Sequence, residues 1–357
     1  MKNSKYIEIY DTTLRDGAQA EGVTFSPSSK IQIAKTLDSF GVDYIEGGFA
    51  ASNPRDMAFF NEIKKIKLKH AQIAAFGSTR RANVKVSEDK GTKALIEADT
   101  PVCTIFGKSW LLHVEEVLKT TAEENLMMIE DTCKFLKDHG KKVIYDAEHF
   151  FDGYKSNSEY AIKTILSAKK GGADSIVLCD TNGGCLSHEI FEIIQQVKEV
   201  CDLPLGIHSH NDSDTGVANA MEAIRAGVIQ VQGTMNGFGE RCGNCNLISV
   251  VANILQKTDK TCLHKPDNLK NLKAVSQFIN EQANLRDNQR APFVGDSAFA
   301  HKAGMHVDGV RKNSDSFEHI LPESVGNMRR ILISELSGAS NVMEKLFEMG
   351  LDNIDRK

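Results

Sequence analysis

Short apolar runs rich in β-forming residues alternate with amphipathic helical stretches over the first two thirds of the chain. Eight runs read as strands, at Tyr6–Tyr10, Tyr44–Gly47, Gln72–Phe76, Pro101–Phe106, Lys142–Tyr145, Ser175–Leu178, Leu203–Ile207 and Val228–Gly233. Helical patterns cover Ser28–Phe40, Asn53–Lys67, Asn83–Ala98, Ala122–His139, Ser158–Lys170, Ser187–Val200, Gly216–Arg225 and Asn246–Gln256. This alternation predicts an α/β fold, a (β/α)8 TIM barrel with its active site at the C-terminal ends of the strands. An open, doubly wound sheet is the alternative.

The length of 357 residues suits one barrel of about 250 residues with a smaller appendage. We expect a catalytic barrel over residues 1–262, and a linker with a small helical lid subdomain over residues 263–357. The alternation stops near Lys265, residues 268–285 read as one helix, and a segment rich in glycine follows. Such a long irregular segment is typical of a lid. The stretch Val342–Leu351 is predicted to be helical.

The charge pattern favours small molecules as partners. The chain has 43 basic and 48 acidic residues, a net charge of -5 and no long block of one sign, which argues against nucleic acid and anionic membranes. The N-terminus has no signal-peptide pattern, and no apolar run approaches the roughly 18 residues of a membrane span. We therefore expect a cytoplasmic protein.

Eight cysteines without a secretion signal are expected to be reduced thiols. Cys242 and Cys245 form a C-x-x-C pair, a pattern that also occurs in zinc and redox sites. Because the chain has no second such pair, we interpret the two cysteines as small apolar neighbours of Asn244.

The segment His208-Ser209-His210 closes the seventh predicted strand. Side chains alternate along a strand, so both imidazoles point to the same side and can bind one divalent cation. Asp16, after the first strand, would add a carboxylate, and Asn244 is a candidate oxygen ligand. This mixed nitrogen and oxygen set suits Mg²⁺, Mn²⁺ or Zn²⁺ with positions left open for substrate, and a 2-oxo acid could fill them. A solvated His-x-His pair without metal is the alternative.

Polar groups gather where most of the predicted strands end. They are Asp11, Arg15 and Asp16 after the first strand, Glu46 at the end of the second, Glu148 at the fifth, Asp180 and Thr181 at the sixth, His208 and His210 at the seventh, and Gly237, Gly239, Glu240, Arg241 and Asn244 after the eighth. Stability alone does not require ionisable groups along one rim of a barrel. We interpret this rim as an active site.

Four polar residues, two at the rim and two in the expected lid, have both a catalytic and a structural interpretation. Arg15 can stabilise a developing alkoxide or form a salt bridge, and Glu148 can move a proton or accept a structural hydrogen bond. His301 and His306 in the expected lid can act as general acid or base, or can pack as ordinary side chains.

Four motifs carry a resemblance to a known family. YDTTLRDGAQAEG, HSHND, NGFGERCGN and HKAGMHVDGV resemble the barrel metallo-enzymes that include 2-isopropylmalate synthase, homocitrate synthase and citramalate synthase. The similarity runs over essentially the whole chain. Three further segments, GGFAASNPRD, YDAEHFFDG and EHILPESVGN, look most like the citramalate synthase branch, in which acetyl-CoA condenses with pyruvate to give (R)-citramalate and CoA for isoleucine biosynthesis.

The resemblance implies a role for each matching residue. Asp16, His208, His210 and Asn244 would bind the metal. Arg15 would bind and polarise the keto acid, Thr181 would hold its carboxylate, and Glu148 would position or deprotonate the acetyl group. His306 would be the lid histidine, reaching the neighbouring subunit of a homodimer.

The chain departs from the family pattern in two respects. Phe317 stands where relatives commonly have a tyrosine after the lid histidine, so a hydroxyl-dependent step is in doubt. Feedback-regulated relatives also continue into a C-terminal amino-acid-binding domain, which we expect to be absent here because this sequence stops at Lys357, either as an unregulated form or as a fragment.

Other functions stay open at this point. Phe76, Thr104, Phe106 and Asp146 are expected to line the substrate pocket. A small pocket favours pyruvate, with 2-oxobutyrate, 2-oxoisovalerate and 2-oxoglutarate as the larger acceptors of synthases that make 2-isopropylmalate or homocitrate. An aldol-type lyase or carboxyltransferase on the same barrel, and a metal-binding barrel without activity, are the remaining alternatives.

Overall fold

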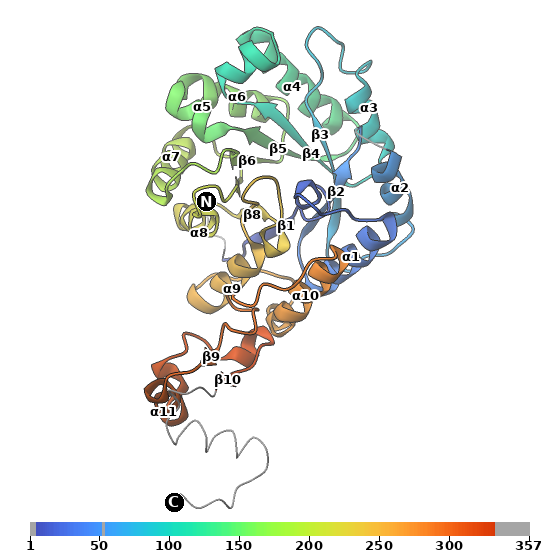
Figure 1. The fold of residues 1–357 in the computed structure, drawn as a ribbon. Helices are drawn as coiled ribbons and strands as arrows, with labels where there is room; N and C mark the ends of the chain where they lie inside the picture. The colour runs from blue at the N-terminus through green and yellow to red at the C-terminus, as the bar shows by residue number, and fades with distance from the viewer. Residues whose placement is uncertain (1–4, 52–53, 333–357) are drawn as a thin grey trace, which may run out of the picture. The chain divides into compact units, whose positions relative to one another are not determined.

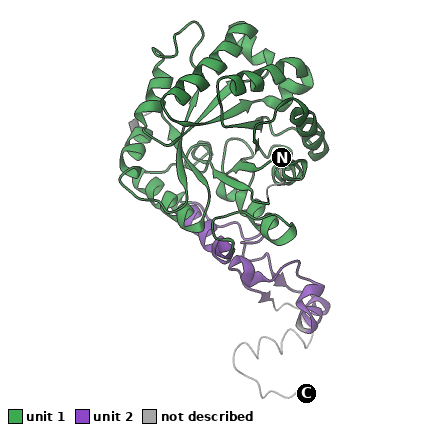
Figure 2. Ribbon diagram, turned by 180° about the vertical axis from the view of Figure 1, so that it is seen from behind, with its two compact units in different colours: residues 1–266, 282–284 green, residues 267–281, 285–357 purple. Residues whose placement is uncertain are grey.

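The structure is a computed structural model of the chain and describes residues 5–51 and 54–332. The chain forms two compact units (Figure 2): residues 1–266 with 282–284, which we call unit 1, and residues 267–281 with 285–357, which we call unit 2. The predicted helix Val342–Leu351 lies outside the described residues. Within them, no helix combines the length and the apolar character that a bilayer span requires.

Unit 1 is built on eight parallel strands that close into a barrel, because β1 pairs with both β2 and β8 (Figure 1). The strands are β1 (Glu8–Asp11), β2 (Tyr44–Phe49), β3 (Gln72–Ser78), β4 (Val102–Lys108), β5 (Lys142–Glu148), β6 (Ser175–Asp180), β7 (Leu205–Ser209) and β8 (Gln230–Gly233). This ring confirms the predicted TIM barrel and excludes the open sheet. No predicted strand boundary is displaced by more than three residues.

Helices surround the barrel and cover its outer face (Figure 1). They are α1 (Pro27–Phe40), α2 (Pro54–Ile63), α3 (Lys90–Glu97), α4 (Ala122–Asp138), α5 (Phe150–Ser156), α6 (Ser158–Lys170), α7 (Ser187–Val200), α8 (Gly216–Ala226) and α9 (Leu247–Lys257). Single helical turns occur at Gly17–Gln19, His113–Val117 and Met235–Gly237. Helix α1 shows how local sequence sets these limits: the Ser26 side chain accepts a hydrogen bond from the Ser29 amide at its start, and Gly41 ends it at a φ of 105°.

Three helices of unit 1 differ from the sequence prediction. Helix α2, predicted to reach Lys67, ends at Ile63. The helix predicted from Asn83 begins only at Lys90, because Asn83 has a φ of 60° and the Asp89 carboxylate caps the amide of Thr92. Helix α5 was not predicted, since it is short and follows His149, whose φ of 53° turns the chain sharply after β5. The turn comes directly after Glu148, the last residue of β5.

The barrel interior is apolar near its middle and polar towards the carboxyl ends of the strands. Tyr10, Tyr44, Ala74, Val102, Ile144, Val177 and Cys179 form one buried cluster contributed by six strands. The Tyr10 hydroxyl donates to Glu46 Oε1 at 3.0 Å and lies 2.7 Å from the Thr104 hydroxyl. Tyr10 therefore joins the apolar interior to the polar groups above it.

Unit 2 contains α10 (Leu272–Gln282) up to residue 281, β9 (Ala300–His301), α11 (Gly304–Lys312) and β10 (Arg330–Ile331), with β9 parallel to β10. The single helix predicted over residues 268–285 is wrong at both ends: a 3-10 turn at Pro266–Asn271 precedes α10, and Asn284 has a φ of 54°. Further 3-10 turns lie at Ser314–Ser316 and Pro322–Val325.

Candidate metal centre and active site

A pocket of about 550 Å³ lies at the carboxyl ends of the barrel strands. Of the residues that the sequence singled out, its lining includes Arg15, Asp16, Phe76, Phe106, Asp146, Glu148, Thr181, His208, His210, Glu240 and Arg241. Thr104, expected in the lining, is instead fully buried at its hydrogen bond with Tyr10. The rim predicted from strand ends is therefore a real cavity.

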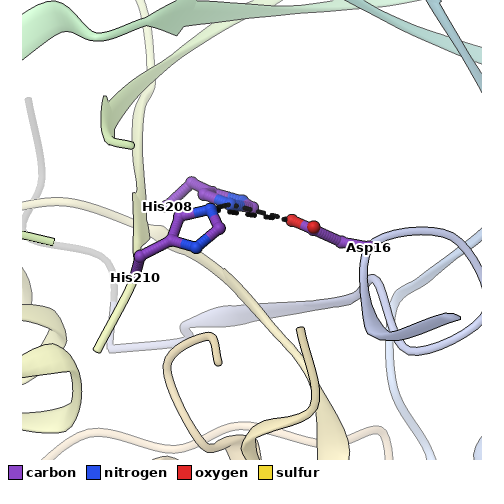
Figure 3. Close-up of side chains that lie close together, drawn as sticks. All are labelled: Asp16, His208 and His210. Atoms are coloured by element: carbon purple, nitrogen blue, oxygen red, sulfur yellow. Dashed lines mark hydrogen bonds and ion pairs between the residues drawn. The ribbon is translucent and has the colours of Figure 1, made fainter. Parts of the chain in front are cut away.

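Asp16, His208 and His210 come together at this pocket, and Figure 3 shows both imidazole rings facing the carboxylate. Asp16 Oδ2 lies 3.2 Å from His208 Nε2 and 3.9 Å from His210 Nε2, and the two Nε2 atoms are 3.4 Å apart. His208 belongs to β7 and His210 follows it, so the two-residue period turns both rings to the same side. All three side chains are buried.

These spacings fit a divalent cation. With ligand bonds of about 2.0–2.2 Å, neighbouring ligand atoms around one ion lie roughly 3–3.5 Å apart. One ligand atom from each of the three residues lies within 4.8 Å of the others. Two imidazoles and one carboxylate leave further coordination positions open, as in catalytic rather than structural metal sites.

The three side chains of this cluster shift one another's pKa values: those of Asp16 and His210 are lowered, and that of His208 is raised. Burial opposes ionisation of Asp16, but the Arg15 guanidinium and the two histidines outweigh it and hold the Asp16 pKa well below its usual value. Burial also opposes a charged His208, yet its hydrogen bond to Asp16 raises the His208 pKa. Burial and the neighbouring His208 lower the pKa of His210 to about 3, so that ring is neutral and free to act as a ligand.

Asn244 is held next to His210 by an isolated backbone bridge between the two residues. Its side-chain amide donates to the Phe238 carbonyl at 3.1 Å, while its buried Oδ1 has no hydrogen-bond partner among the described residues. A Cβ at Gly239 would lie 2.3 Å from Asn244 Nδ2, so glycine is required there. An orphaned buried oxygen beside a ligand-type histidine suits a cation.

Arg15 is fixed on two sides within the pocket. Its Nε donates to Glu46 Oε2, its guanidinium lies 3.8 Å from the centre of the Phe76 ring, and its Nη1 is 3.6 Å from Asp16 Oδ2. Glu46 lies inside β2, not at its end, and a β-bulge between Glu46 and Gly48 follows it. The arginine therefore reaches the pocket in a set orientation, and its salt bridge does not remove it from the cavity lining.

Glu148 and Thr181 face the same pocket from β5 and from the loop after β6. Glu148 Oε2 pairs with the ammonium of Lys108, which ends β4. The Thr181 hydroxyl accepts a hydrogen bond of 2.9 Å from the His149 amide. Arg241 pairs with Asp212 through two nitrogens, at 2.8 and 2.9 Å, and donates to the Thr181 carbonyl at 2.7 Å. This link joins the loops that follow β6, β7 and β8.

The two histidines predicted for the lid lie in unit 2, in different surroundings. His306 of α11 is exposed and stacks on Phe317, with ring centres 4.4 Å apart. His301 is buried and lies 3.1 Å from Glu318 Oε1, while Glu318 also pairs with Arg329. His301 is therefore a packed structural residue, whereas His306 is accessible.

All eight cysteines of the chain lie among the described residues. All eight are free thiols, and only Cys242 of the C-x-x-C pair is exposed. Burial raises the pKa of the Cys245 thiol to about 12, so that thiol stays protonated. This agrees with their interpretation as neighbours of Asn244.

The sequence interpretation missed two polar side chains that contact predicted site residues. Gln232, fully buried in β8, lies 2.9 Å from His208 Nδ1 and donates to Asp146 at 3.0 Å. Lys108 pairs with Glu148. A signal existed for Gln232, because a glutamine inside the apolar run Val228–Gly233 of a closed barrel must find buried partners.

The comparisons with known proteins agree with this geometry. The model of the HMGL-like family matches residues 6–279, and a second model, described as homocitrate synthase post-HMGL domain-like, matches residues 293–357. An (R)-citramalate synthase of Aquifex aeolicus is 55% identical over 98% of this chain and 66% of its own length. The (R)-citramalate synthase of Sulfolobus acidocaldarius is 50% identical over 99% of this chain and 68% of its own. The chain thus spans about two thirds of the length of these relatives.

Solved structures share the fold at low sequence identity. A hydroxymethylglutaryl-CoA lyase from Pseudomonas aeruginosa matches with a TM-score of 0.64 and 19% identity, over 79% of this chain and 94% of its own. The carboxyl transferase domain of Rhizobium etli pyruvate carboxylase matches with a TM-score of 0.61 and 16% identity, over 98% of this chain and 54% of its own. These two likenesses concern the fold alone. The family model and the identity to the curated relatives are what show that this chain belongs to the HMGL-like family of barrel proteins, in the branch of the (R)-citramalate synthases.

Proposed function

We propose that this chain is the catalytic part of a divalent-metal-dependent acyltransferase that condenses acetyl-CoA with pyruvate and water to give (R)-citramalate and CoA. The observation that carries the proposal is the cluster of Asp16, His208 and His210 in the barrel pocket of a chain 55% identical to an (R)-citramalate synthase. The place of this reaction in isoleucine biosynthesis is part of the same proposal.

Asp16, His208 and His210 would hold the metal, with Asn244 as a fourth ligand. When bound, a divalent cation polarises the keto group of a 2-oxo acid. The neutral state of His210 and the ionised state of Asp16 support this role, since both offer electron pairs. Mg²⁺, Mn²⁺ and Zn²⁺ all accept this donor set.

Arg15 and Thr181 would bind the 2-oxo acid. The Arg15 guanidinium is fixed by Glu46 and Phe76, so its remaining N–H groups can stabilise the negative charge that develops on the keto oxygen. Thr181 would hold the carboxylate of the 2-oxo acid from the loop that Arg241 supports. Both residues line the same cavity, which supports a shared ligand.

Glu148 would take the proton from the acetyl methyl group. The resulting carbanion attacks the keto carbon to form the new carbon–carbon bond, the keto oxygen becomes a hydroxyl, and water then cleaves the thioester to release CoA. The ion pair with Lys108 supports this role because it holds the Glu148 carboxylate at the pocket.

Aromatic side chains favour a small acceptor. Phe76 and Phe106 stack with their ring centres 5.3 Å apart, and Phe49 packs edge-on against both at 5.7 and 6.3 Å. All three line the pocket, so an acceptor with a bulky side chain would have to displace an aromatic ring. Pyruvate, with its methyl group, is the acceptor that this wall favours over larger 2-oxo acids.

His306 would serve as the lid histidine, and we propose that it acts in a homodimer in which each unit 2 serves the barrel of a second copy. Its exposure on α11 supports the role, since a general acid or base must be accessible. His306 also lies with Phe317 in the lining of a cavity of about 540 Å³ within unit 2. In this chain the Phe317 ring supports the imidazole by stacking and donates no hydrogen bond.

The test is CoA release from acetyl-CoA, measured by free-thiol titration with Mn²⁺ or Mg²⁺ and a panel of 2-oxo acids, with EDTA as the control. We expect metal-dependent release with pyruvate. Release with a larger 2-oxo acid alone would refute the choice of substrate, and equal release in EDTA would refute the metal. No release with any acceptor would contradict the proposed reaction for this chain.

A further inference from the structure

The Gln232 side-chain amide connects two pocket residues, His208 and Asp146. From its contacts we infer that Gln232 is a positioning residue: it selects the tautomer of His208 that carries its proton on Nδ1 and so directs the Nε2 lone pair at the metal. The inference rests on the metal centre of the proposed function and concerns a residue outside its ligand set.

The barrel register brings the two side chains together. His208 of β7 and Gln232 of β8 are Cα partners in the parallel pairing, so their side chains leave neighbouring strands on the same side. Gln232 is fully buried, and its Oε1 lies 2.9 Å from His208 Nδ1. A buried contact of this length is a hydrogen bond. Which of the two side chains donates it depends on whether the amide turns its oxygen or its NH₂ group to His208.

Asp146 fixes that orientation. Gln232 Nε2 donates to Asp146 Oδ1 at 3.0 Å, and a carboxyl oxygen that carries no proton only accepts hydrogen bonds. Burial raises the Asp146 pKa to about 7, so the carboxylate is mostly ionised above that pH. The amide must therefore turn its NH₂ group to Asp146 and its carbonyl oxygen to His208. A carbonyl oxygen also only accepts, so the proton between Gln232 and His208 must be on His208 Nδ1.

The consequence is felt on the opposite side of the ring. Nε2 lies 3.2 Å from Asp16 Oδ2 and 3.4 Å from His210 Nε2. When Nε2 gives up the hydrogen that it donates to Asp16, a proton held on Nδ1 leaves a neutral imidazole with its lone pair on Nε2. Without the acceptor at Nδ1, the ring would leave a buried N–H unpaired or adopt the other tautomer, whose Nε2 carries a hydrogen. Partners of this kind typically change metal affinity 10–100-fold.

The chain offers a matched control for a purely structural role. Gln230 is on the same strand, two residues earlier, and is equally buried, at 2% exposed. Its amide donates to Glu8 Oε2 at 2.9 Å, at the opposite end of the barrel from the pocket. Replacing either glutamine by methionine removes one buried amide of the same size, but only one of the two amides contacts a candidate ligand.

Mn²⁺ binding to wild type, Gln232→Met and Gln230→Met is to be measured by isothermal titration calorimetry at pH 7.5, with apo-protein unfolding followed in EDTA. We expect Gln232→Met to weaken Mn²⁺ binding 10–100-fold and Gln230→Met to leave it within about twofold, while both lose similar stability. Unchanged Mn²⁺ affinity in Gln232→Met, or an equal loss in both variants, would overturn the inference.

A double variant tests the direction of the hydrogen bonds. Gln232→Glu combined with Asp146→Asn reverses the outer bond, because the new amide now donates to the new carboxylate, yet an oxygen still accepts from His208 Nδ1. Mn²⁺ affinity is expected to recover to within a few-fold of wild type. Affinity as weak as in Gln232→Met would mean that the acceptor on His208 is not what matters.

A measurement on wild type does not depend on how the variants fold. In ¹⁵N-histidine-labelled, Zn²⁺-loaded protein, nitrogen NMR is expected to show His208 protonated at Nδ1 and coordinated through Nε2, with the resonance assigned by its loss in His208→Gln. The reverse arrangement would refute the inference and leave the condensation reaction standing. If wild type binds neither ion, the metal centre falls with it, whereas the CoA-release assay tests the reaction separately.

Discussion

The two ends of the barrel both carry carboxylates and histidines, but their hydrogen bonding is opposite. At the amino end, Asp43 accepts from the Tyr6 hydroxyl at 2.9 Å and from the Ile9 amide at 2.8 Å, with His264 at 3.4 Å. At the carboxyl end, Asp16 faces two imidazole nitrogens, one of them in a ring with a lowered pKa. The Asp43 carboxyl is engaged by hydrogen bonds within the fold. The Asp16 carboxylate instead lies in a pocket beside ligand-type nitrogens, one of them on the neutral His210 ring, where a cation can bind.

Removing a carboxylate from each end should separate these roles most strongly. Asp16→Ala is expected to abolish measurable Mn²⁺ binding by calorimetry and to lower CoA release roughly 1,000-fold, because metal polarisation is worth several kcal/mol. Asp43→Ala, the matched change at the amino end, should bind Mn²⁺ like wild type. Comparable loss of Mn²⁺ binding in the two variants would erase the distinction between the ends.

Within the carboxyl end, Glu148→Gln should affect the reaction and leave the metal in place. Loss of a positioned general base typically lowers kcat about 100- to 10,000-fold. Steady-state CoA release and Mn²⁺ calorimetry on the same preparation measure both effects. The control is Glu8→Gln at the amino end, which should keep kcat. A Glu148→Gln enzyme with normal kcat would show that this carboxylate serves only its ion pair with Lys108.

The aromatic wall of the pocket should control the size of the acceptor. Phe106→Ala removes a ring that stacks on Phe76, and the space gained should shift the ratio of kcat/KM for 2-oxobutyrate over pyruvate upward by about 10- to 100-fold. Tyr6→Phe at the amino end is the control and should leave this ratio unchanged. An unaltered ratio in Phe106→Ala would mean that the acceptor binds elsewhere in the pocket.

The amino end should reveal itself through the pH dependence of stability. Burial raises the pKa of Asp43 to about 6, so the folded chain holds this proton more tightly than the unfolded chain, where the pKa is 3.8. The contribution of Asp43 to stability is therefore fully present below pH 3.8 and is lost as the pH rises through about 6. The free energy of unfolding of wild type, minus that of Asp43→Asn, should fall by on the order of 2 kcal/mol between pH 4 and pH 7. Urea unfolding followed by circular dichroism measures it, and a constant difference would contradict the assignment.

The sequence predicted the barrel because each strand pairs with its neighbour in chain order, so local patterns were sufficient. It also predicted the meeting of Asp16 with His208 and His210, since a closed parallel barrel brings all strand ends to one rim. What it could not predict were contacts that depend on register across the barrel. Gln232 lies beside His208 only because of one alignment of β7 with β8.

Backbone turns were the second limit. His149, Asn83 and Asn284 all adopt a positive φ without being glycine, and each shifts a helix boundary or starts a short helix that periodicity alone does not reveal. The sequence also did not reveal the role of Glu46. A carboxylate inside a strand can be mistaken for a strand end, and only its hydrogen bonds to Tyr10 and Arg15 show that it orients the arginine.

The contacts of Arg15 with Glu46 and Phe76 have a consequence for how tightly a ligand can bind. A free arginine side chain loses roughly 2 kcal/mol of rotational entropy when it grips an anion. Here Glu46 and Phe76 restrict the Arg15 side chain when the chain folds, so little further side-chain entropy is lost when a carboxylate or keto group binds to the guanidinium. Arg15 is thus pre-organised for its ligand, and we expect little rearrangement of this side chain between the free and the bound protein.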